Sequence, residues 1–263
     1  MSETLLSEID NGVGIVTLNR PERHNAFDDA LIRELSETLV RMDTDPDVRV
    51  LVLSSTGKSF SAGADIDWMR RAAGYDLEEA QRDAVELAGM LRLLNDMRKP
   101  TVARVQGPAY GGGVGLVAAC DIAIATYDAQ FALSEVRLGI IPAVISPYVI
   151  GAIGERKARR YMLTAERFSA AEAYRIGLVH EIVPGEAELD EAVGEIVDAL
   201  LANGPAALGE CKALIKAVAN RPITSDIIVD TAKRIARVRA SAEGREGMAA
   251  FLEKRKPNWI QKQ

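Results

Sequence analysis

Apolar residues recur along the N-terminal part of the chain in short blocks that switch between two periods. Residues 12–20 (GVGIVTLNR) alternate apolar with small or polar side chains, which is typical of a β-strand. Leucines at four-residue intervals, beginning with Leu31 and Leu35, predict a helix over about residues 27–42. Residues 48–55 (VRVLVLSS) are almost continuously apolar, and this pattern indicates a strand that is buried on both faces.

The same switching between strand and helix patterns continues further along the chain. A long helical pattern covers residues 78–97, and Pro100 stops it. Ser169 and Glu172 match a capping box that opens a helix, and Gly177 ends that helix. Further short strands share the apolar, β-branched pattern and are expected at residues 101–107, 121–126, 129–133 and 178–184.

Helical patterns fill the C-terminal part of the chain. They cover residues 188–204, 205–220, 223–239 and 243–256. If this region stood alone it would expose much apolar surface, so we expect it to pack against other subunits. The sequence therefore predicts an α/β core over residues 1–187, which would carry the active site, and a helical oligomerisation region over residues 188–263.

The composition is that of an ordinary globular protein, because 48% of the 263 residues are hydrophobic and 27% are charged. A net charge of -6 and a pI of about 5.2 argue against a general nucleic-acid-binding protein, which needs a basic surface. The N-terminal residues do not form a secretory signal, and no apolar run is long enough to span a membrane. We therefore expect a cytoplasmic protein. Cys120 and Cys211 lack metal-ligand spacing, which predicts two buried, reduced thiols.

Three kinds of cofactor or catalytic site are weakly supported. Gly113, Gly115 and Ala118 satisfy the dinucleotide pattern G-x-G-x-x-A, but the following strand does not end in a clear ribose-binding acid. No serine lies in the G-x-S-x-G context of nucleophilic hydrolases. His24 lies in a polar loop and His180 in a strand pattern, so we interpret them as solvated and structural. A zinc site lacks ligands.

Two glycine-containing turns and one acid remain as candidate chemistry. Residues 61–65 (SAGAD) and residues 111–113 (GGG) each open a helix and leave backbone N–H groups free. Two such turns could direct two amides at one oxygen, as in an oxyanion hole, or could simply be tight connections between strands and helices. Glu135 lies among apolar residues. Burial would raise the pKa of its carboxyl group and suit it to proton transfer, whereas an exposed Glu135 would be an ordinary surface acid.

In order along the chain, six segments resemble the enoyl-CoA hydratase/isomerase (crotonase) superfamily. They are residues 18–27 (LNRPERHNAF), 60–66 (FSAGADI), 105–125 (VQGPAYGGGVGLVAACDIAIA), 129–142 (AQFALSEVRLGIIP), 160–184 (RYMLTAERFSAAEAYRIGLVHEIVP) and 246–259 (EGMAAFLEKRKPNW). The resemblance implies repeated ββα units wound into a spiral, followed by a helical trimerisation region. It also implies a homotrimer or dimer of trimers that binds acyl-CoA without a metal or redox cofactor, coenzyme A being part of the substrate.

Carried over position by position, the resemblance assigns two oxyanion-hole amides to Ala64 and Gly112, which would hold the thioester oxygen. Further positions match residues that line or contact the coenzyme A site: Arg23, Ala62, Asp65, Ile66, Phe251 and Lys254. In some members the last two contacts come from a neighbouring subunit. The family often has lysine at the position of Asp67, so we expect that phosphate contact to be lost or moved.

Gly115 is the main departure from the family pattern. Hydratases with two acids have glutamate there and a second glutamate at the position of Glu135, and these acids hold the water and move its proton. Only Glu135 is retained in this chain. A single acid at this position is also found in many enoyl-CoA isomerases, which need no bound water.

A narrower resemblance, carried by residues 111–125, 131–150 and 159–168, is to the bacterial methylglutaconyl-CoA or isohexenylglutaconyl-CoA hydratases of leucine and acyclic-terpene catabolism. Their substrates carry a second carboxylate. We hypothesise that Gly115 makes room for such a branched, acidic acyl group and avoids placing two anions in one dry pocket. Arg137 either pairs with that acidic group or is a surface residue.

Together these resemblances predict hydration of a 2-enoyl-CoA to a 3-hydroxyacyl-CoA, with 3-methylglutaconyl-CoA or a close relative as the substrate. Glu135 would activate water for attack at the β-carbon and return a proton at the α-carbon. One alternative is a double-bond isomerase that uses Glu135 as a proton shuttle. An RNA-binding protein is disfavoured by the acidic balance, and a catalytically idle acyl-CoA binder is disfavoured by the retained Glu135.

Overall fold

The structure of the protein is a computed structural model that describes residues 4–260; residues 1–3 and 261–263, at the outer ends of the two predicted regions, lie outside this range. The larger of two sheets has the strand order β1-β2-β3-β4-β6-β9. Its strands are β1 (Leu5–Asp10), β2 (Val13–Leu18), β3 (Val50–Ser55), β4 (Thr101–Val105), β6 (Ile122–Thr126) and β9 (Glu181–Val183). β1 pairs antiparallel with β2, and the other neighbours pair in parallel. The smaller sheet consists of β5 (Ala109–Tyr110), β7 (Gln130–Ala132) and β8 (Phe168–Ser169).

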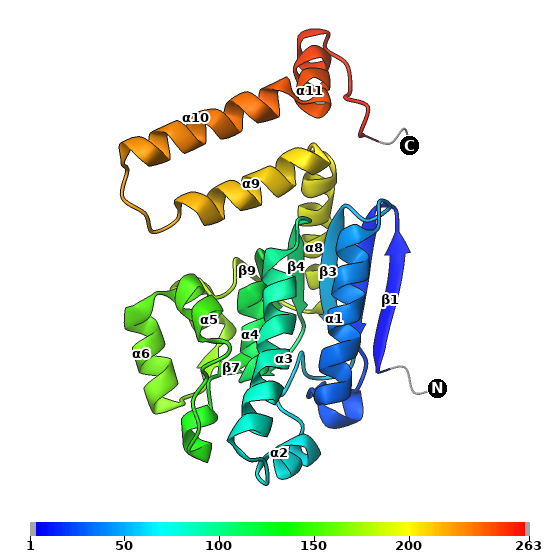
Figure 1. The fold of residues 1–263 in the computed structure, drawn as a ribbon. Helices are drawn as coiled ribbons and strands as arrows, with labels where there is room; N and C mark the ends of the chain where they lie inside the picture. Colours follow the sequence, from blue (N-terminus) through cyan, green and yellow to red (C-terminus); the bar gives the residue numbers. More distant parts are fainter. Residues whose placement is uncertain (1–3, 261–263) are drawn as a thin grey trace.

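Helices cover both faces of the larger sheet (Figure 1). On one face lie α1 (Asp29–Thr44), α3 (Leu77–Asp96) and α4 (Gly112–Ala119), and α8 (Glu186–Leu201) lies on the other. The other helical elements are η1 (Pro21–Arg23), α2 (Ile66–Ala72), η2 (Glu135–Leu138), α5 (Ser146–Ile153), α6 (Glu155–Thr164), α7 (Ala170–Ile176), α9 (Pro205–Val218), α10 (Ser225–Ala240) and α11 (Ala242–Leu252). Within residues 4–260, none of these helices is both long and apolar enough to cross a lipid bilayer.

The chain repeats one unit as it passes along the sheet: a long strand, a short extended segment and a helix. After β2, Phe27 forms a parallel bridge with Ala64 before α1 begins, and after β3, Ser61 bridges Ala109 before α2 and α3. β5 then pairs with β7, and β7 with β8, so the short segments of successive units lie side by side. The predicted spiral of ββα units is confirmed. Because of this spiral arrangement, the segments that lead into α2 and α4, which belong to different units, meet beside the small sheet.

The two faces of the larger sheet carry separate hydrophobic cores, because side chains alternate along each strand. Val50 and Val52 of β3 face α8, whereas Leu51 and Leu53 face the core under α1, α3 and α4. β3 is buried along its whole length, as its apolar run predicts. Each fully buried valine or leucine side chain contributes roughly 1.5–3 kcal/mol, so the sheet is a firm support for the loops at its strand ends.

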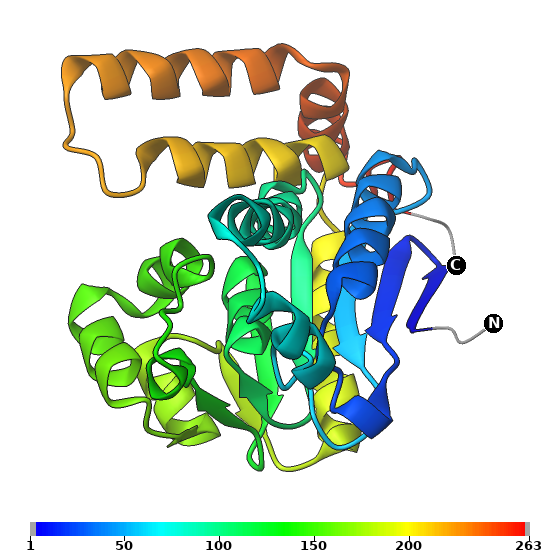
Figure 2. The ribbon, with the colours of Figure 1, turned by 60° about the horizontal axis from the view of Figure 1, so that its bottom comes forward.

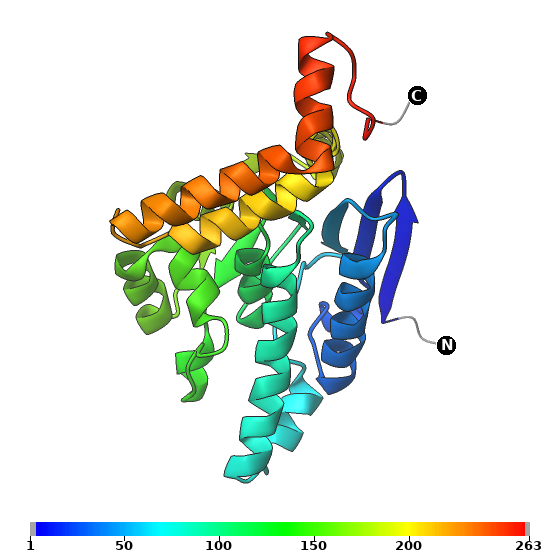
Figure 3. The same cartoon turned by 45° about the horizontal axis from the view of Figure 1, so that its top comes forward.

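The C-terminal helices divide between this core and an arm formed by α9, α10 and α11. α8 packs Leu189 and Val193 on the sheet, although the predicted division assigns it to the C-terminal region. α9 and α10 lie side by side beyond the end of the sheet, and α11 stands across their shared end (Figures 2 and 3). The arm exposes apolar side chains at Ile215, Ile223, Ile228, Val229, Ile235, Met248, Phe251 and Leu252. Its exposed apolar surface fits the expectation that the arm packs on another subunit, which stays a prediction.

The β1–β2 hairpin is a feature that the sequence patterns above do not predict. Its turn consists of Asn11 and Gly12, with φ angles of 47° and 89°. Two consecutive positive φ angles are what an Asn-Gly hairpin turn adopts, so this dipeptide was the available signal. α5 and α6 are likewise absent from the predicted elements. α5 is a short apolar run without a clear helical period, whereas α6 (ERKARRYMLT) is a short polar segment with few apolar positions from which to recognise a helix.

Two local predictions need correction. Ser169 caps α7 by accepting a hydrogen bond from the Glu172 N–H, but the Glu172 carboxylate binds Tyr161 and Arg175 instead of completing the capping box. The stronger cationic partner therefore wins over the backbone amide. Cys120 is buried, and burial raises the pKa of its thiol to about 12. Cys211 is exposed, so the prediction of two buried thiols is wrong for that residue.

Candidate active site

The loop that follows β3, which we call the Ala64 loop (residues 61–65), alternates between inward and outward side chains into the start of α2. Ala62, Ala64 and Ile66 are exposed, whereas Ser61, Gly63 and Asp65 are buried. Ile66 keeps 67% of its surface exposed, whereas Asp65 keeps 2%. Three positions predicted to lie at the substrate therefore share the open side of one loop, and Asp65 faces the opposite way.

Phe27 fixes the backbone on both sides of Ala64. Its N–H donates to the Gly63 carbonyl at 2.7 Å, and its carbonyl accepts from the Asp65 N–H at 2.9 Å. In a parallel bridge of this kind the intervening residue directs its own N–H away from the partner segment. Within residues 4–260 the Ala64 N–H has no protein acceptor. It is therefore available to a ligand.

Gly112 is the first residue of α4 and belongs to the second turn, which we call the glycine loop (residues 111–113). Gly111 precedes it with φ 50° and ψ -118°, a backbone conformation that L side chains disfavour. The first amides of a helix have no carbonyl a turn earlier to bind, and no other acceptor for the Gly112 N–H lies in the described part of the chain. The positive end of the α4 dipole adds to this amide.

The Ala64 loop and the glycine loop are in backbone contact. A Cβ atom placed on Gly63 would lie 2.8 Å from the Tyr110 carbonyl oxygen and 3.3 Å from the Gly112 nitrogen. A Cβ atom placed on Gly113 would lie 2.5 Å from the Ser61 carbonyl oxygen. Neither position admits a side chain. Glycine therefore lets the two loops approach closely enough for their free amides to serve one oxygen, as an oxyanion hole requires.

Glu135 begins η2 and places its carboxylate beside the glycine loop. Its Oε1 atom lies 3.2 Å from the position that a Cβ atom on Gly111 would take. Its Oε2 atom is buried and has no hydrogen-bond partner within residues 4–260. Burial raises the pKa of Glu135, and its own backbone amide opposes this shift only in part. A half-buried carboxyl group with a raised pKa and an unused oxygen is suited to accept and return a proton.

Asp65 has the opposite environment to Glu135. Its Oδ1 atom accepts from the Asp67 and Trp68 amides at 2.8 and 3.3 Å and so caps α2. Its Oδ2 atom binds the guanidinium groups of Arg20 and Arg23, each at 3.1 Å. Burial alone would raise the pKa of Asp65, but the two amides and the Arg23 guanidinium outweigh it and hold the pKa below its usual range. Asp65 is thus fully engaged with the protein.

Arg23 and Asp67 form the outer side of this cluster. Arg23 is 45% exposed and binds the Asp67 carboxylate at 2.7 Å, and Arg70 binds the same carboxylate at 2.7 Å. Where the family often has a lysine, this chain therefore has an acid flanked by two arginines. That the phosphate contact is lost or moved stays a prediction.

Phe251 and Lys254 do not join the other predicted site residues within one chain. Phe251 lies in α11 with 82% of its surface exposed, and Lys254 follows that helix. α11 and α2 are at opposite ends of the molecule (Figure 1). Contact of Phe251 and Lys254 with coenzyme A therefore requires a neighbouring subunit and stays a prediction.

Gly115 lies on the buried side of α4, and Ile145 fills the space beside it. A Cβ atom placed on Gly115 would lie 2.3 Å from Ile145 Cγ2 and 2.9 Å from Ile145 Cβ. Ile145 itself is 2% exposed. The prediction that Gly115 makes room for a branched acyl group is therefore wrong, because that room is occupied by a packed side chain. The same packing leaves no space for a carboxylate at this position.

The two histidines have local partners outside the candidate site. His24 Nδ1 lies 3.0 Å from the Ser59 hydroxyl, and His180 Nδ1 accepts from the Ala123 N–H at 3.1 Å. Among residues 4–260, no three side chains of His, Cys, Asp or Glu gather as a metal-binding group. Glu135 is the acid–base candidate beside the free amides.

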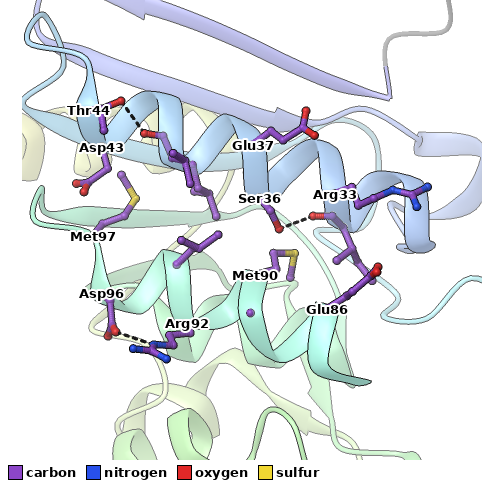
Figure 4. A pocket seen from close by; sticks show the side chains of 15 residues that line it. Arg33, Ser36, Glu37, Asp43, Thr44, Glu86, Met90, Arg92, Asp96 and Met97 are labelled. Carbon is purple, nitrogen blue, oxygen red and sulfur yellow. Dashed lines mark hydrogen bonds and ion pairs between the residues drawn. The ribbon is translucent and has the colours of Figure 1, made fainter. Parts of the chain in front are cut away.

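A separate cavity of about 750 Å³ lies in the groove between α1 and α3 (Figure 4). It is lined by neither loop nor by Glu135. Polar groups on its walls are paired with other protein groups: Thr44 donates to a backbone carbonyl of α1, Asp43 binds Arg98, and Asp96 binds Arg92 and Lys216. It holds neither of the free amides nor Glu135, so we assign the chemistry to the two loops rather than to this cavity.

Arg20 and Phe27 are site-supporting residues that the sequence reasoning missed. Residues 18–27 carry part of the family resemblance, but their polar pattern predicts only a loop. In the structure Arg20 is 8% exposed and Phe27 is 1% exposed. Phe27 could have been recognised as a single large apolar residue at the end of a polar loop. No pattern in a single sequence indicates that an arginine such as Arg20 is buried.

Comparison with known proteins places these features in a family context. The chain matches the family described as Enoyl-CoA hydratase/isomerase over residues 8–262. It is similar to the crystal structure of an enoyl-CoA hydratase from Shewanella pealeana, with a TM-score of 0.95, 45% identity, and coverage of 97% of this chain and 96% of that chain. It is also similar to Pseudomonas aeruginosa AtuE, with a TM-score of 0.94, 39% identity, and coverage of 98% and 100%. A crotonyl-CoA hydratase from Syntrophomonas wolfei is 35% identical over 270 residues, which cover 99% of each chain.

Proposed function

The chain belongs to the enoyl-CoA hydratase/isomerase family, and from that premise we propose that it is an enoyl-CoA hydratase, adding water to the α,β-double bond of an acyl-CoA thioester. Two of the similar proteins are named enoyl-CoA hydratase and crotonyl-CoA hydratase. The observation that carries the proposal is the position of Glu135. Its carboxylate has an unpartnered, buried oxygen and a raised pKa, and it lies against the turn that presents the Gly112 amide.

In the proposed reaction the thioester oxygen lies between the Ala64 and Gly112 amides. Water attacks the β-carbon while the Glu135 carboxylate accepts one of its protons, and the electrons of the double bond move toward the thioester oxygen. The resulting enolate is stabilised by the two amides, each worth about 3–4 kcal/mol of barrier lowering. Glu135 then returns the proton to the α-carbon. The 3-hydroxyacyl-CoA product contains both the hydroxyl and the hydrogen of one water, and the carboxylate is regenerated.

A double-bond isomerase is the second candidate function, and the packing at Gly115 supports it. Because Ile145 occupies the place of a second acid, Glu135 would have to hold and deprotonate water without help. Moving a proton between the α- and γ-carbons needs one carboxylate and the same enolate stabilisation. Hydration remains the first choice because the two similar proteins named above for a single activity are an enoyl-CoA hydratase and a crotonyl-CoA hydratase.

We further propose a branched or acidic acyl group, with 3-methylglutaconyl-CoA as the specific candidate. The support is the narrower resemblance of residues 111–125 and 131–150, together with Arg137. This arginine is exposed on η2, two residues after Glu135, so a second carboxylate on the substrate could reach it without desolvating a buried group. The charge argument for Gly115 also remains, since a second carboxylate near Glu135 would repel an acidic substrate.

We propose that the protein acts as a homotrimer or a dimer of trimers. The support is the apolar surface of the arm and the separation of Phe251 and Lys254 from the loops of their own chain. In such an assembly these two residues would contact the nucleotide of coenzyme A bound to a neighbouring subunit. The molar mass in solution tests the assembly, and an increased KM of Lys254→Ala for the CoA thioester tests the contact.

The reaction is tested by the loss of conjugated-thioester absorbance when crotonyl-CoA or 3-methylglutaconyl-CoA is offered to wild type, Glu135→Gln and Glu86→Gln. Glu86 is an exposed acid on α3 and serves as the matched control. Hydration by wild type and Glu86→Gln, but not by Glu135→Gln, supports the proposal. Faster turnover of 3-methylglutaconyl-CoA supports the acidic acyl group, and faster turnover of crotonyl-CoA contradicts it. If neither is hydrated and a β,γ-enoyl-CoA is isomerised, the protein is the isomerase.

A further inference from the structure

Arg20 is a buried cation beside the Ala64 loop. Its Nη1 atom donates to the Ala26 carbonyl at 2.8 Å and lies 3.1 Å from Asp28 Oδ2. Its Nη2 atom donates to Asp65 Oδ2 at 3.1 Å. Arginine is seldom buried this deeply unless it is paired, and here one guanidinium group holds three acceptors from two separate segments of the chain.

These acceptors flank the pairing that presents the Ala64 amide. Ala26 and Asp28 are the chain neighbours of Phe27, and Asp65 is the chain neighbour of Ala64. Phe27 is itself hydrogen-bonded to the residues before and after Ala64. Arg20 therefore holds both sides of the same backbone bridge, one through Ala26 and Asp28 and the other through Asp65.

Phe27 extends this support to the second amide. A Cβ atom placed on Gly112 would lie 2.5 Å from Phe27 Cε2, so the Phe27 ring lies directly against the start of α4. A shift of residues 26–28 would move the backbone that brackets Ala64 and also the ring that contacts Gly112. The position of both amides thus depends on the segment that Arg20 holds.

We propose that Arg20 is a positioning residue for the oxyanion hole: it sets the placement of the Ala64 and Gly112 amides without touching the substrate. The inference rests on the proposed function, in which these amides bind the thioester oxygen. A misplacement of roughly 1 Å at a reacting centre costs on the order of 100-fold in rate. We expect Arg20→Met to lower kcat by about that factor and to leave the Kd for free coenzyme A, which has no acyl carbonyl, unchanged.

Two further variants separate position from charge. Arg20→Lys keeps the positive charge but lacks the forked donors that reach three acceptors, so its kcat should fall between those of wild type and Arg20→Met. Arg159→Met is the matched control, because Arg159 is also a paired arginine but is 69% exposed, and its ion pair with Glu155 lies within α6. It pairs with neither residues 26–28 nor Asp65, so its kcat should stay within about twofold of wild type, as for other exposed ion pairs.

The deciding readout is the infrared carbonyl stretch of bound butyryl-CoA labelled with carbon-13 at the thioester carbon. This saturated ligand does not react, and only folded, liganded protein contributes to the difference spectrum. In wild type and Arg159→Met the stretch should lie below its value for the thioester in water, and in Arg20→Met it should move back toward that value. If Arg20→Met does not fold, Arg20→Lys gives the same comparison with a smaller shift.

The two possible failures are distinguishable. An equally lowered stretch in wild type and both Arg20 variants would overturn the role of Arg20 while leaving the oxyanion hole intact. A stretch that is not lowered in wild type would instead contradict the proposed function, because the amides would not be polarising the carbonyl.

Discussion

Asp65 and Glu135 are two shielded carboxylates on adjoining parts of the same site, and the protein treats them in opposite ways. Asp65 accepts hydrogen bonds from two backbone amides and two arginines, and its pKa is lowered. Glu135 has one buried oxygen with no partner in the described part of the chain, and its pKa is raised. Environment, rather than residue type, assigns one acid to hold the loop and the other to move a proton.

The comparison also shows that one part of the site, the Ala64 loop, is held rigidly, whereas another part, Glu135, is left free to react. The Ala64 loop is tied by Phe27, Arg20 and Asp65, so its amide is held before any substrate binds. Preorganised donors of this kind need no rearrangement during the reaction. Glu135 is left unsatisfied, which costs stability and keeps its oxygen free for a proton.

Replacing the reactive acid should have the largest effect on turnover. Glu135→Gln keeps the shape of the side chain but cannot accept a proton, so we expect kcat for enoyl-CoA hydration to fall by about 10²- to 10⁴-fold. Steady-state assays of thioester absorbance measure this. Asp65→Asn, assayed at a temperature where it is folded, should lose less; a larger loss in Asp65→Asn than in Glu135→Gln would reverse the roles assigned to the two acids.

Of the two acids, Asp65 should have the larger effect on stability when it is replaced. Asp65→Asn leaves the guanidinium group of Arg20 with fewer partners and weakens the cap of α2. Removing one partner of a buried ion pair costs about 3–5 kcal/mol of unfolding free energy, and we expect a value near the lower limit because Arg23 is 45% exposed. Urea unfolding followed by circular dichroism measures it. Glu135→Gln should show no loss in the same assay.

The packing of Ile145 against Gly115 can be tested by substituting each residue alone and both together. Gly115→Ala places a methyl group against Ile145 and should destabilise the protein by about 1–3 kcal/mol. Ile145→Ala alone should also destabilise, by about 2–5 kcal/mol through the cavity it leaves. In the double variant the two changes compensate, so its loss should be smaller than the sum by at least about 0.5 kcal/mol. Additive losses would show that the two residues are not in contact.

The smallest expected effect is a change in how the unfolding free energy depends on pH. It separates Asp65 from Glu135 most clearly, because the two acids should shift stability with pH in opposite directions. The lowered pKa of Asp65 gives a stabilisation that is present above its unfolded-state pKa and is lost as the pH falls through its folded-state pKa. The deficit of Asp65→Asn relative to wild type should therefore shrink in acid.

Glu135 should follow the opposite sign. Its raised pKa means that wild type loses stability as the pH rises from the unfolded-state value through the folded-state value, because the buried group must then ionise. Glu135→Gln should gain stability relative to wild type over that rise. Unfolding free energies between about pH 2 and pH 8 test both signs, because the Asp65 change lies below its ordinary pKa of about 3.9 and the Glu135 change lies above its ordinary pKa of about 4.3. Curves that run parallel for the two variants would contradict the contrast between the two acids.

Sequence patterns predict the supporting frame of the site better than its polar interior. The continuous apolar run of β3 and the helical spacing of apolar residues in α1 and α3 place these elements, because each pattern follows directly from which faces of the element are buried. The family resemblance indicates Ala64, Gly112 and Glu135 as the site residues. It does not reveal which way a side chain faces, and Asp65 points into the protein although its neighbours Ala64 and Ile66 face outward.

Contacts between segments that are distant in the sequence account for the features of the site that the sequence does not predict. Arg20 and Asp65 are 45 residues apart, and no local pattern pairs them. Gly115 is similar: the absence of the family glutamate suggests free space beside it, whereas Ile145, which lies on a later segment, takes up that space. The omission of Arg20 and the error at Gly115 have the same cause. The environment of a single residue is set by tertiary contacts, and these produce no periodic pattern in the sequence.

The most direct test of the central claim is the pH dependence of kcat/KM for the enoyl-CoA that wild type hydrates. A single carboxylate base with a raised pKa predicts that kcat/KM increases with pH through one ionisation, with a logarithmic slope of about 1, above the ordinary range of glutamic acid. Glu135→Gln should lack this ionisation. A wild-type profile that is flat in acid, or that increases with a slope of about 2, would contradict the claim that Glu135 alone moves the proton.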